Sequence, residues 1–77
     1  MKDITYTITR QIAVLSFSVN GWSVELNEVS WNGAAPKLDL RRWGSGHVRQ
    51  GKGVTLTRSE AAALCQALAR EVENDRE

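Results

Sequence analysis

The residues of this sequence that could do chemistry are basic and aromatic side chains, and they gather between Lys37 and Arg58. This stretch holds six basic residues and one acidic residue, whereas the rest of the chain holds four basic and eight acidic residues. Because the whole chain carries a net charge of only +1, this distribution predicts a local basic surface that faces a polyanion. Aromatic rings beside the cations favour single-stranded nucleic acid, whose phosphates attract the cations and whose unpaired bases stack on the rings.

One alternating segment, PKLDLRRW at residues 36–43, places several of these side chains together. Lys37, Arg41 and Trp43 fall on one parity, and the two leucines fall on the other. If the leucines face a helix, the basic and aromatic side chains stand on the open face of the sheet. The candidate nucleic-acid-binding residues are Trp31, Lys37, Arg41, Trp43, Arg49 and Lys52, with Trp22 and His47 as additional candidates.

Each candidate also has a structural interpretation. Core packing is the commoner role of any single tryptophan, so Trp22 could serve either role, while contact is favoured for Trp31 and Trp43. Asp39 shares the basic face, and we expect it to orient a neighbouring arginine or a backbone amide. We expect Cys65, on the apolar stripe of the predicted helix, to be a small buried hydrophobe rather than a nucleophile.

Glycines punctuate the basic segment at residues 44–53. Residues 46–53 nearly match the phosphate-binding pattern G-x-x-x-x-G-K-[ST], but Gly53 replaces the hydroxyl residue and a strand follows where a helix is required. We therefore reject a P-loop. The glycines form either a flexible connector or a loop that lays Arg49 and Lys52 along a phosphate backbone.

Other classes of function find no support in the sequence. One cysteine and one histidine cannot form an internal disulfide or a tetrahedral zinc site. No nucleophile with a base and no pair of carboxylates stands out, so we expect no catalytic residues, no metal, no cofactor and no small-molecule substrate. Neither a membrane span of about 20 apolar residues nor a signal peptide is recognisable. We expect a cytoplasmic protein without a membrane partner.

A small sheet and one helix must position these residues. Strand-like alternation predicts four strands, at about 4–19, 22–31, 36–43 and 53–56. Asn-Gly pairs at 20–21 and 32–33 predict hairpin turns, and a change of parity near residue 15 indicates a bulge. A capping-box pattern from Thr57 to Glu60 predicts a helix over about 58–74. The predicted fold is α+β (ββββα): a four-stranded antiparallel sheet with the helix laid on its apolar face, in a single domain over 1–77.

Three segments of the sequence, in order and separation, resemble a known family: GWSVELNEVSWNG, KLDLRRW and GKGVTLTRSE. They are similar to the single-stranded-DNA-binding domain of the transcriptional coactivator family named for positive cofactor 4, and most similar to its small bacterial members. The most specific part is D-[LI]-R-x-[WY] followed by G-K-G-[VI]-[ST]-L-[TS]-x-x-[EQ]. The resemblance, from about Gly21 to Leu68, implies a ββββα protomer and a homodimer whose curved sheets form channels for single strands. It also implies little sequence preference and no catalysis.

The resemblance assigns roles by position. Arg41 and Trp43 match the basic and aromatic contacts of the family, Trp31 matches an aromatic residue at the end of the second strand, and Lys52 matches the basic residue of the glycine loop. Lys37 and Arg49 have no fixed counterpart because the adjoining turn and loop vary in length. The serine- and lysine-rich extension of the eukaryotic coactivator is not seen here, so the resemblance gives no basis for coactivator activity.

Three functions remain open. The first is a nucleoid-associated homodimer that binds single-stranded DNA in transcription, replication or repair. The second is a single-stranded RNA-binding module on the same sheet face, which contacts to the 2′-hydroxyl would distinguish. The third is a protein-interaction domain with Trp31 and Trp43 as anchors. The basic cluster disfavours the third, because the centres of protein interfaces are depleted of charge.

Overall fold

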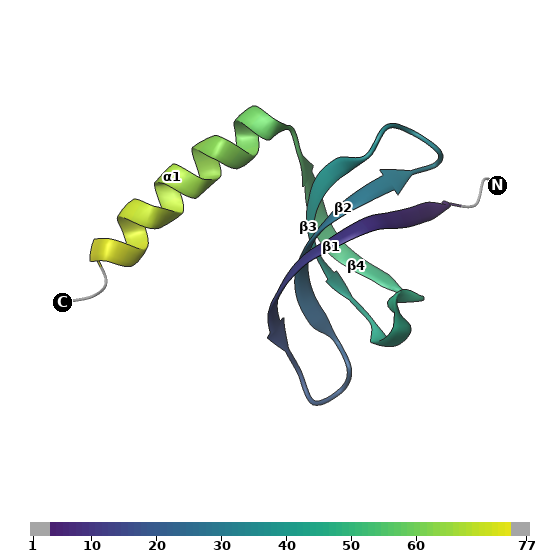
Figure 1. Ribbon diagram of the computed structural model, residues 1–77. Helices are drawn as coiled ribbons and strands as arrows, with labels where there is room; N and C mark the ends of the chain where they lie inside the picture. The colour runs from purple at the N-terminus through teal and green to yellow at the C-terminus, as the bar shows by residue number, and fades with distance from the viewer. Residues whose placement is uncertain (1–3, 75–77) are drawn as a thin grey trace.

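The computed structural model of the protein describes residues 4–74, which form one antiparallel sheet followed by a helix (Figure 1). The strands follow one another in space in the order β1-β2-β3-β4. This arrangement confirms the predicted ββββα fold; residues 1–3 and 75–77 of the predicted domain lie outside the described residues. The elements are β1 (Tyr6–Phe17), β2 (Ser23–Trp31), β3 (Lys37–Trp43), a 3-10 turn η1 (Ser45–His47), β4 (Gln50–Leu56) and α1 (Arg58–Asn74).

Both predicted hairpin turns are present. Asn32 and Gly33 have positive φ angles of 52° and 77°, the conformation that an Asn-Gly pair adopts most easily. Residues 18–22 form the other turn, in which the Ser18 amide donates to the Trp22 carbonyl at 2.7 Å. Because that turn uses residues assigned to strands, β1 ends earlier and β2 begins one residue later than predicted.

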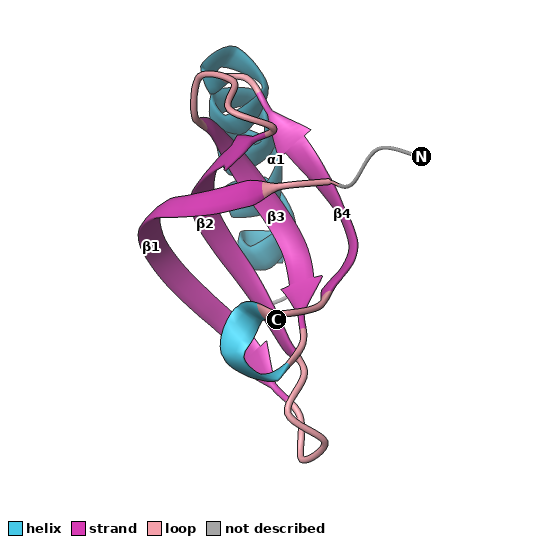
Figure 2. Cartoon of the chain, turned by 90° about the vertical axis from the view of Figure 1, so that its right-hand side faces the viewer, coloured by secondary structure: helices cyan, strands magenta, loops and turns pink. Residues whose placement is uncertain are grey.

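β1 bends strongly because its pairing with β2 is interrupted. The register shifts between Ile8 and Arg10, between Gln11 and Ala13, and between Val14 and Ser16. The third shift confirms the bulge predicted near residue 15, and the other two were not predicted. Bulges bend a strand and increase its twist, so the sheet curves (Figure 2) and acquires a concave face.

The concave face carries alternate residues of β2 and β3, and most of them are buried. Trp43 and Val29 are the fully buried apolar side chains there. Four polar residues are buried on the same face, namely Ser23, Glu25, Asn27 and Asp39. The interior of the sheet is therefore unusually polar, and its side chains hydrogen-bond to one another.

The helix α1 begins where predicted. The Thr57 amide donates to Glu60 Oε1 at 2.8 Å, and the Glu60 amide donates to Thr57 Oγ1 at 3.1 Å. These two bonds confirm the capping box. Within residues 4–74 no helix is both long enough and apolar enough to cross a membrane.

The prediction that α1 lies on the apolar face of the sheet is wrong. The helix leaves the end of β4 and extends away from the sheet (Figure 1), and no side chain of α1 is buried. An open groove of about 450 Å³ separates the apolar side of the helix from the convex face of the sheet. The groove is lined by Leu26, Leu38, Leu56, Ala61, Leu64, Cys65, Leu68, Ala69 and Val72.

Two further observations follow from this open arrangement. Cys65 is exposed, so its predicted burial is wrong for a single chain. The radius of gyration is 14.1 Å, whereas a compact domain of this length would have about 11.5 Å. The apolar stripe predicted in α1 is real, but within one chain it faces an open groove.

Candidate nucleic-acid interface

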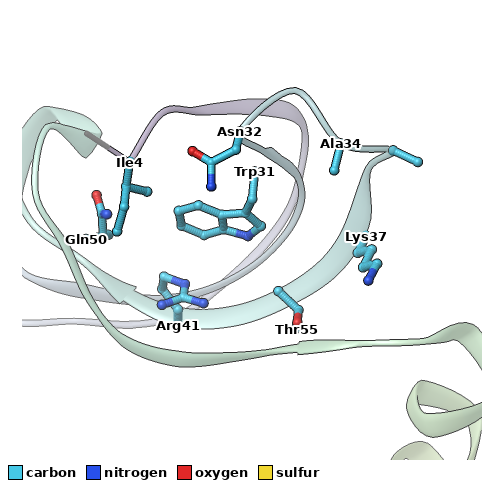
Figure 3. Close-up of a pocket in the computed structure, with 9 residues that line it drawn as sticks. Ile4, Trp31, Asn32, Ala34, Lys37, Arg41, Gln50 and Thr55 are labelled. Atoms are coloured by element: carbon cyan, nitrogen blue, oxygen red, sulfur yellow. The ribbon is translucent and has the colours of Figure 1, made fainter. Parts of the chain in front are cut away.

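A pocket of about 550 Å³ opens beside the β2–β3 turn, above β3 and β4 (Figure 3). Three of the predicted contact residues, Trp31, Lys37 and Arg41, line it together. We call it the Trp31 pocket, because the indole lies at its centre in Figure 3. Its remaining lining residues are Ile4, Asn32, Ala34, Ala35, Gln50 and Thr55.

The Trp31 indole is held in place from several sides but remains partly exposed. Its Nε1 donates to Asp39 Oδ2 at 3.2 Å, and the guanidinium carbon of Arg41 lies 4.7 Å from the ring centroid. The Tyr6 ring packs at a centroid distance of 5.6 Å. A nucleobase can stack on the exposed part of such a ring or on the guanidinium plane. Because the indole and the guanidinium are already held in place, neither side chain has to become ordered when the base binds.

Asp39 fixes Arg41. The carboxylate is fully buried and accepts two bonds from the guanidinium, from Nε at 2.8 Å and from Nη2 at 2.9 Å. Arg41 Nη1 donates to the Gly51 carbonyl at 3.1 Å. These contacts confirm the expectation that Asp39 orients an arginine. A guanidinium has five N–H donors, so each terminal nitrogen keeps one that has no partner among the described residues.

The prediction that Trp43 offers an exposed platform for a base is wrong. The residue does lie on the predicted face of β3, but it is fully buried. Tyr6 covers it from β1 at a centroid distance of 5.2 Å, and His47 packs edge-on at 5.5 Å. Trp43 therefore belongs to the small core that supports Trp31, whose ring lies nearly parallel to it at 6.3 Å.

His47 is part of a buried polar cluster. Its Nε2 lies 2.9 Å and 3.0 Å from the two carboxylate oxygens of Glu25, and its carbonyl accepts from the Tyr6 hydroxyl. Burial acts to raise the pKa of Glu25, but hydrogen bonds from Asn27, Ser23 and His47, together with the charge interaction with His47, hold it below its ordinary value. The contacts of His47 thus hold the η1 turn against the sheet.

The other predicted residues lie elsewhere. Lys52 is exposed on β4 and does not line the Trp31 pocket. Arg49 is exposed, with its guanidinium carbon 5.7 Å from the Trp22 ring centroid. Arg42 lies over the same ring at 5.0 Å. The predicted set therefore divides into the Trp31 pocket, a lysine on the sheet edge, a group around Trp22, and the buried Trp43.

Sequence reasoning missed Gln50 because it placed the start of β4 three residues late, and it assigned no face to Thr55 although this residue lay inside the predicted strand. Gln50 pairs with Trp43, and Thr55 pairs with Asp39, which brings both to the concave face. Tyr6 pairs with Trp31 across the β1–β2 ladder. Tyr6 and Ile8 are two residues apart, and Ile8 pairs with the buried Val29. This alternation in β1 was the available signal that Tyr6 lies on the same face of the sheet as Trp31 and Val29.

A tryptophan backed by an arginine on the concave face of a curved sheet is a combination that small nucleic-acid-binding modules use. The family described as Transcriptional Coactivator p15 (PC4) matches residues 18–67, and the chain belongs to this family. A protein of Treponema pallidum (strain Nichols), described as an uncharacterized protein, is 52% identical over 62 residues, which cover 80% of this chain and 73% of that protein. Family membership makes the chain a domain of the single-stranded-DNA-binding or coactivator type, with nucleic acid as its ligand.

Proposed function

We propose that this protein is a homodimer that binds single-stranded DNA with little sequence preference and serves transcription, replication or repair. The observation that carries the proposal is the Trp31 pocket. Its indole is partly exposed, is backed by Arg41 at 4.7 Å, and has Lys37 in the same pocket wall. This is the combination of a stacking surface and cations that binds unpaired nucleotides.

Stacking explains why a single strand is preferred to a duplex. The face of a base is available only where the base is unpaired, and every base has such a face. Phosphates would be contacted by the exposed Lys37 and Lys52 and by the remaining N–H donors of Arg41. Each phosphate that is neutralised on a single strand lowers the slope of log K against log salt by about 0.7, so binding should weaken steeply as salt rises.

The dimer is proposed from the apolar groove. One side of the groove is the convex face of the sheet and the other is α1, and neither covers the other. Leu68 and Val72 are more than half exposed in the single chain. Burying such side chains contributes about 25 cal/mol per Å² of apolar surface, so a second copy would supply the missing core. Sedimentation of the protein, and of Leu68→Glu, tests this: a monomer at micromolar concentration would contradict it.

The decisive experiment on the ligand is a titration of tryptophan fluorescence with an oligo-dT of about 20 nucleotides, a duplex and an oligo-U of equal length. The measurement is repeated at low and high salt with the wild type, Trp31→Ala and Lys37→Gln. Arg70→Gln, an exposed charge on α1, is the matched control for the lysine. We expect quenching by the single DNA strand, loss of about 1–3 kcal/mol of binding for Trp31→Ala, and a shallower salt dependence for Lys37→Gln only.

Other results would point to other functions. Equal or tighter binding of the RNA strand would favour the RNA-binding alternative. Flat titrations at low salt, with a folded protein, would contradict nucleic-acid stacking at Trp31 and favour a protein partner. Folding is checked for each variant by circular dichroism, so that lost binding is not confused with an unfolded chain.

A further inference from the structure

A second aromatic and basic group lies outside the Trp31 pocket. It consists of Trp22, Arg42 and Arg49, and we call it the Trp22 cluster. The two guanidinium carbons lie 5.0 Å and 5.7 Å from the ring centroid, and both arginines are exposed. These three residues line neither the Trp31 pocket nor the apolar groove beside α1. No role in the core or in the proposed dimer accounts for two cations on one partly exposed ring.

The ring of Trp22 is seated on glycine backbone. A Cβ atom at Gly51 would lie 3.1 Å from Cζ3 of the indole, and one at Gly44 would lie 3.5 Å from Cζ2. The bare backbone at these two positions lets the ring rest against the end of β3 and the beginning of β4. Trp22 is therefore held on the sheet, although it comes from a turn in the chain.

The two tryptophan sites are joined through consecutive residues of β3. Arg41 and Arg42 point to opposite faces, as neighbours in a strand do, and each lies over a tryptophan, at 4.7 Å and 5.0 Å. The backbone of Gly51 lies between them. Its carbonyl accepts from Arg41 on the concave side, and Trp22 contacts the same residue on the other side.

β4 is an edge strand, and at Gly51-Lys52-Gly53 the edge carries a single side chain, the exposed Lys52. The edge is thin here, so a polymer can pass from one face to the other without crossing bulky residues. No acidic residue occurs between Asp39 and Glu60 in the sequence. The path over the edge is therefore positively charged along its length, which suits a chain of phosphates.

We propose that a DNA single strand bound in the Trp31 pocket continues over the β4 edge at residues 51–53 and makes a second contact on the Trp22 cluster. There Arg42 and Arg49 each take a phosphate, and a base stacks on the exposed part of the indole or on a guanidinium plane. This inference rests on the proposed function. It adds that the strand wraps the sheet edge, and that the bound length exceeds what the pocket alone can hold.

The test compares two oligo-dT lengths, about 6 and about 20 nucleotides, over a range of salt concentrations. The variant Arg42→Gln/Arg49→Gln leaves Trp22 and its glycine seat unchanged. The control Arg58→Gln/Arg70→Gln removes the same charge from exposed positions on α1. We expect the first variant to make the salt slope for the long oligomer shallower by about 1.4, which is two phosphates at about 0.7 each. The slope for the short oligomer, and both slopes of the control, should stay at the wild-type values.

A second measurement follows Trp22 itself. The variant Trp22→Phe should lose part of the fluorescence quenching by the long oligomer and none of the quenching by the short one. The inference is overturned if Arg42→Gln/Arg49→Gln matches the control at both lengths, or if it weakens both lengths equally. Failure of the wild type to bind either oligomer would instead overturn the proposed function, and the two failures are thus distinguishable.

Discussion

Replacing Asp39 with asparagine should loosen the Trp31 pocket and destabilise the fold at the same time. The carboxylate is fully buried and accepts three hydrogen bonds, two from Arg41 and one from Trp31. Asparagine keeps the shape but turns one acceptor oxygen into a donor that faces an N–H group. At least one bond to the guanidinium is lost, and a hydrogen bond to a charged group contributes about 1.5–3 kcal/mol.

The remaining charge of Arg41 adds to this loss. The arginine side chain is only 14% exposed, and breaking a buried ion pair by removing one partner costs about 3–5 kcal/mol. Because water still reaches part of the guanidinium, we expect Asp39→Asn to lower the free energy of unfolding by about 2–4 kcal/mol. Affinity for single-stranded DNA should fall as well, since neither Arg41 nor the Trp31 indole is then held in position.

Glu28→Gln is the matched control. This carboxylate lies on the opposite face, is 22% exposed, and meets Arg10 and Arg58 only at 3.8 Å and 3.7 Å. Pairs of this kind contribute less than about 1 kcal/mol. Urea unfolding gives the stabilities, and fluorescence titration well below the transition gives the affinities. A loss for Asp39→Asn no larger than for Glu28→Gln would refute the anchoring role, and a large loss of stability with unchanged DNA affinity would refute the positioning role.

Three further predictions concern the core, the edge strand and pH. Trp43→Ala should lower the free energy of unfolding by about 3–5 kcal/mol, measured by urea unfolding, because it empties the buried core. Gly53→Ala should cost about 3 kcal/mol or more in the same assay, since its Cβ would lie 2.0 Å from Cβ of Arg41 and the β3–β4 pairing must shift. Because the folded pKa of Glu25 is lowered, its contribution is complete above the ordinary value of 4.5 and is lost as the pH falls through the folded pKa. Glu25→Gln should therefore flatten the acid loss of stability below pH 4.5, and an unchanged profile would contradict this.

Local signals in the sequence predicted most of the secondary structure. Two Asn-Gly turns, the capping box of α1 and the division of β3 into an apolar and a basic face are all set by residues close in sequence, so they could be recognised without a structure. The start of β4 could not be predicted in this way. Gly51 and Gly53 suggested a loop, whereas each is a strand residue that leaves room for a neighbour, Trp22 or Arg41.

The burial of Trp43 shows where reading of the sequence fails for the site. Parity placed the residue on the correct face, but burial depends on Tyr6 from β1 and His47 from η1, which meet across the concave face. Tyr6 lies 37 residues before Trp43 in the sequence, so no local pattern around Trp43 indicates that Tyr6 covers it. The prediction of where α1 packs was wrong for a related reason. An apolar stripe indicates that one side of a helix is to be buried, but it does not indicate which surface buries it.

The two faces of the sheet carry different kinds of residue and serve different roles. The concave face holds the small buried core of Trp43 and Val29 beside buried polar residues, and one of these, Asp39, holds Trp31 and Arg41 in place. Orienting the ligand-binding residues in this way leaves few apolar side chains to stabilise a single chain. The leucines and the apolar stripe of α1 are all on the convex side, where only another surface can bury them. A preorganised pocket on one face therefore makes the fold depend on assembly through the other, and the proposed dimer and the proposed DNA site are consequences of the same distribution of residues.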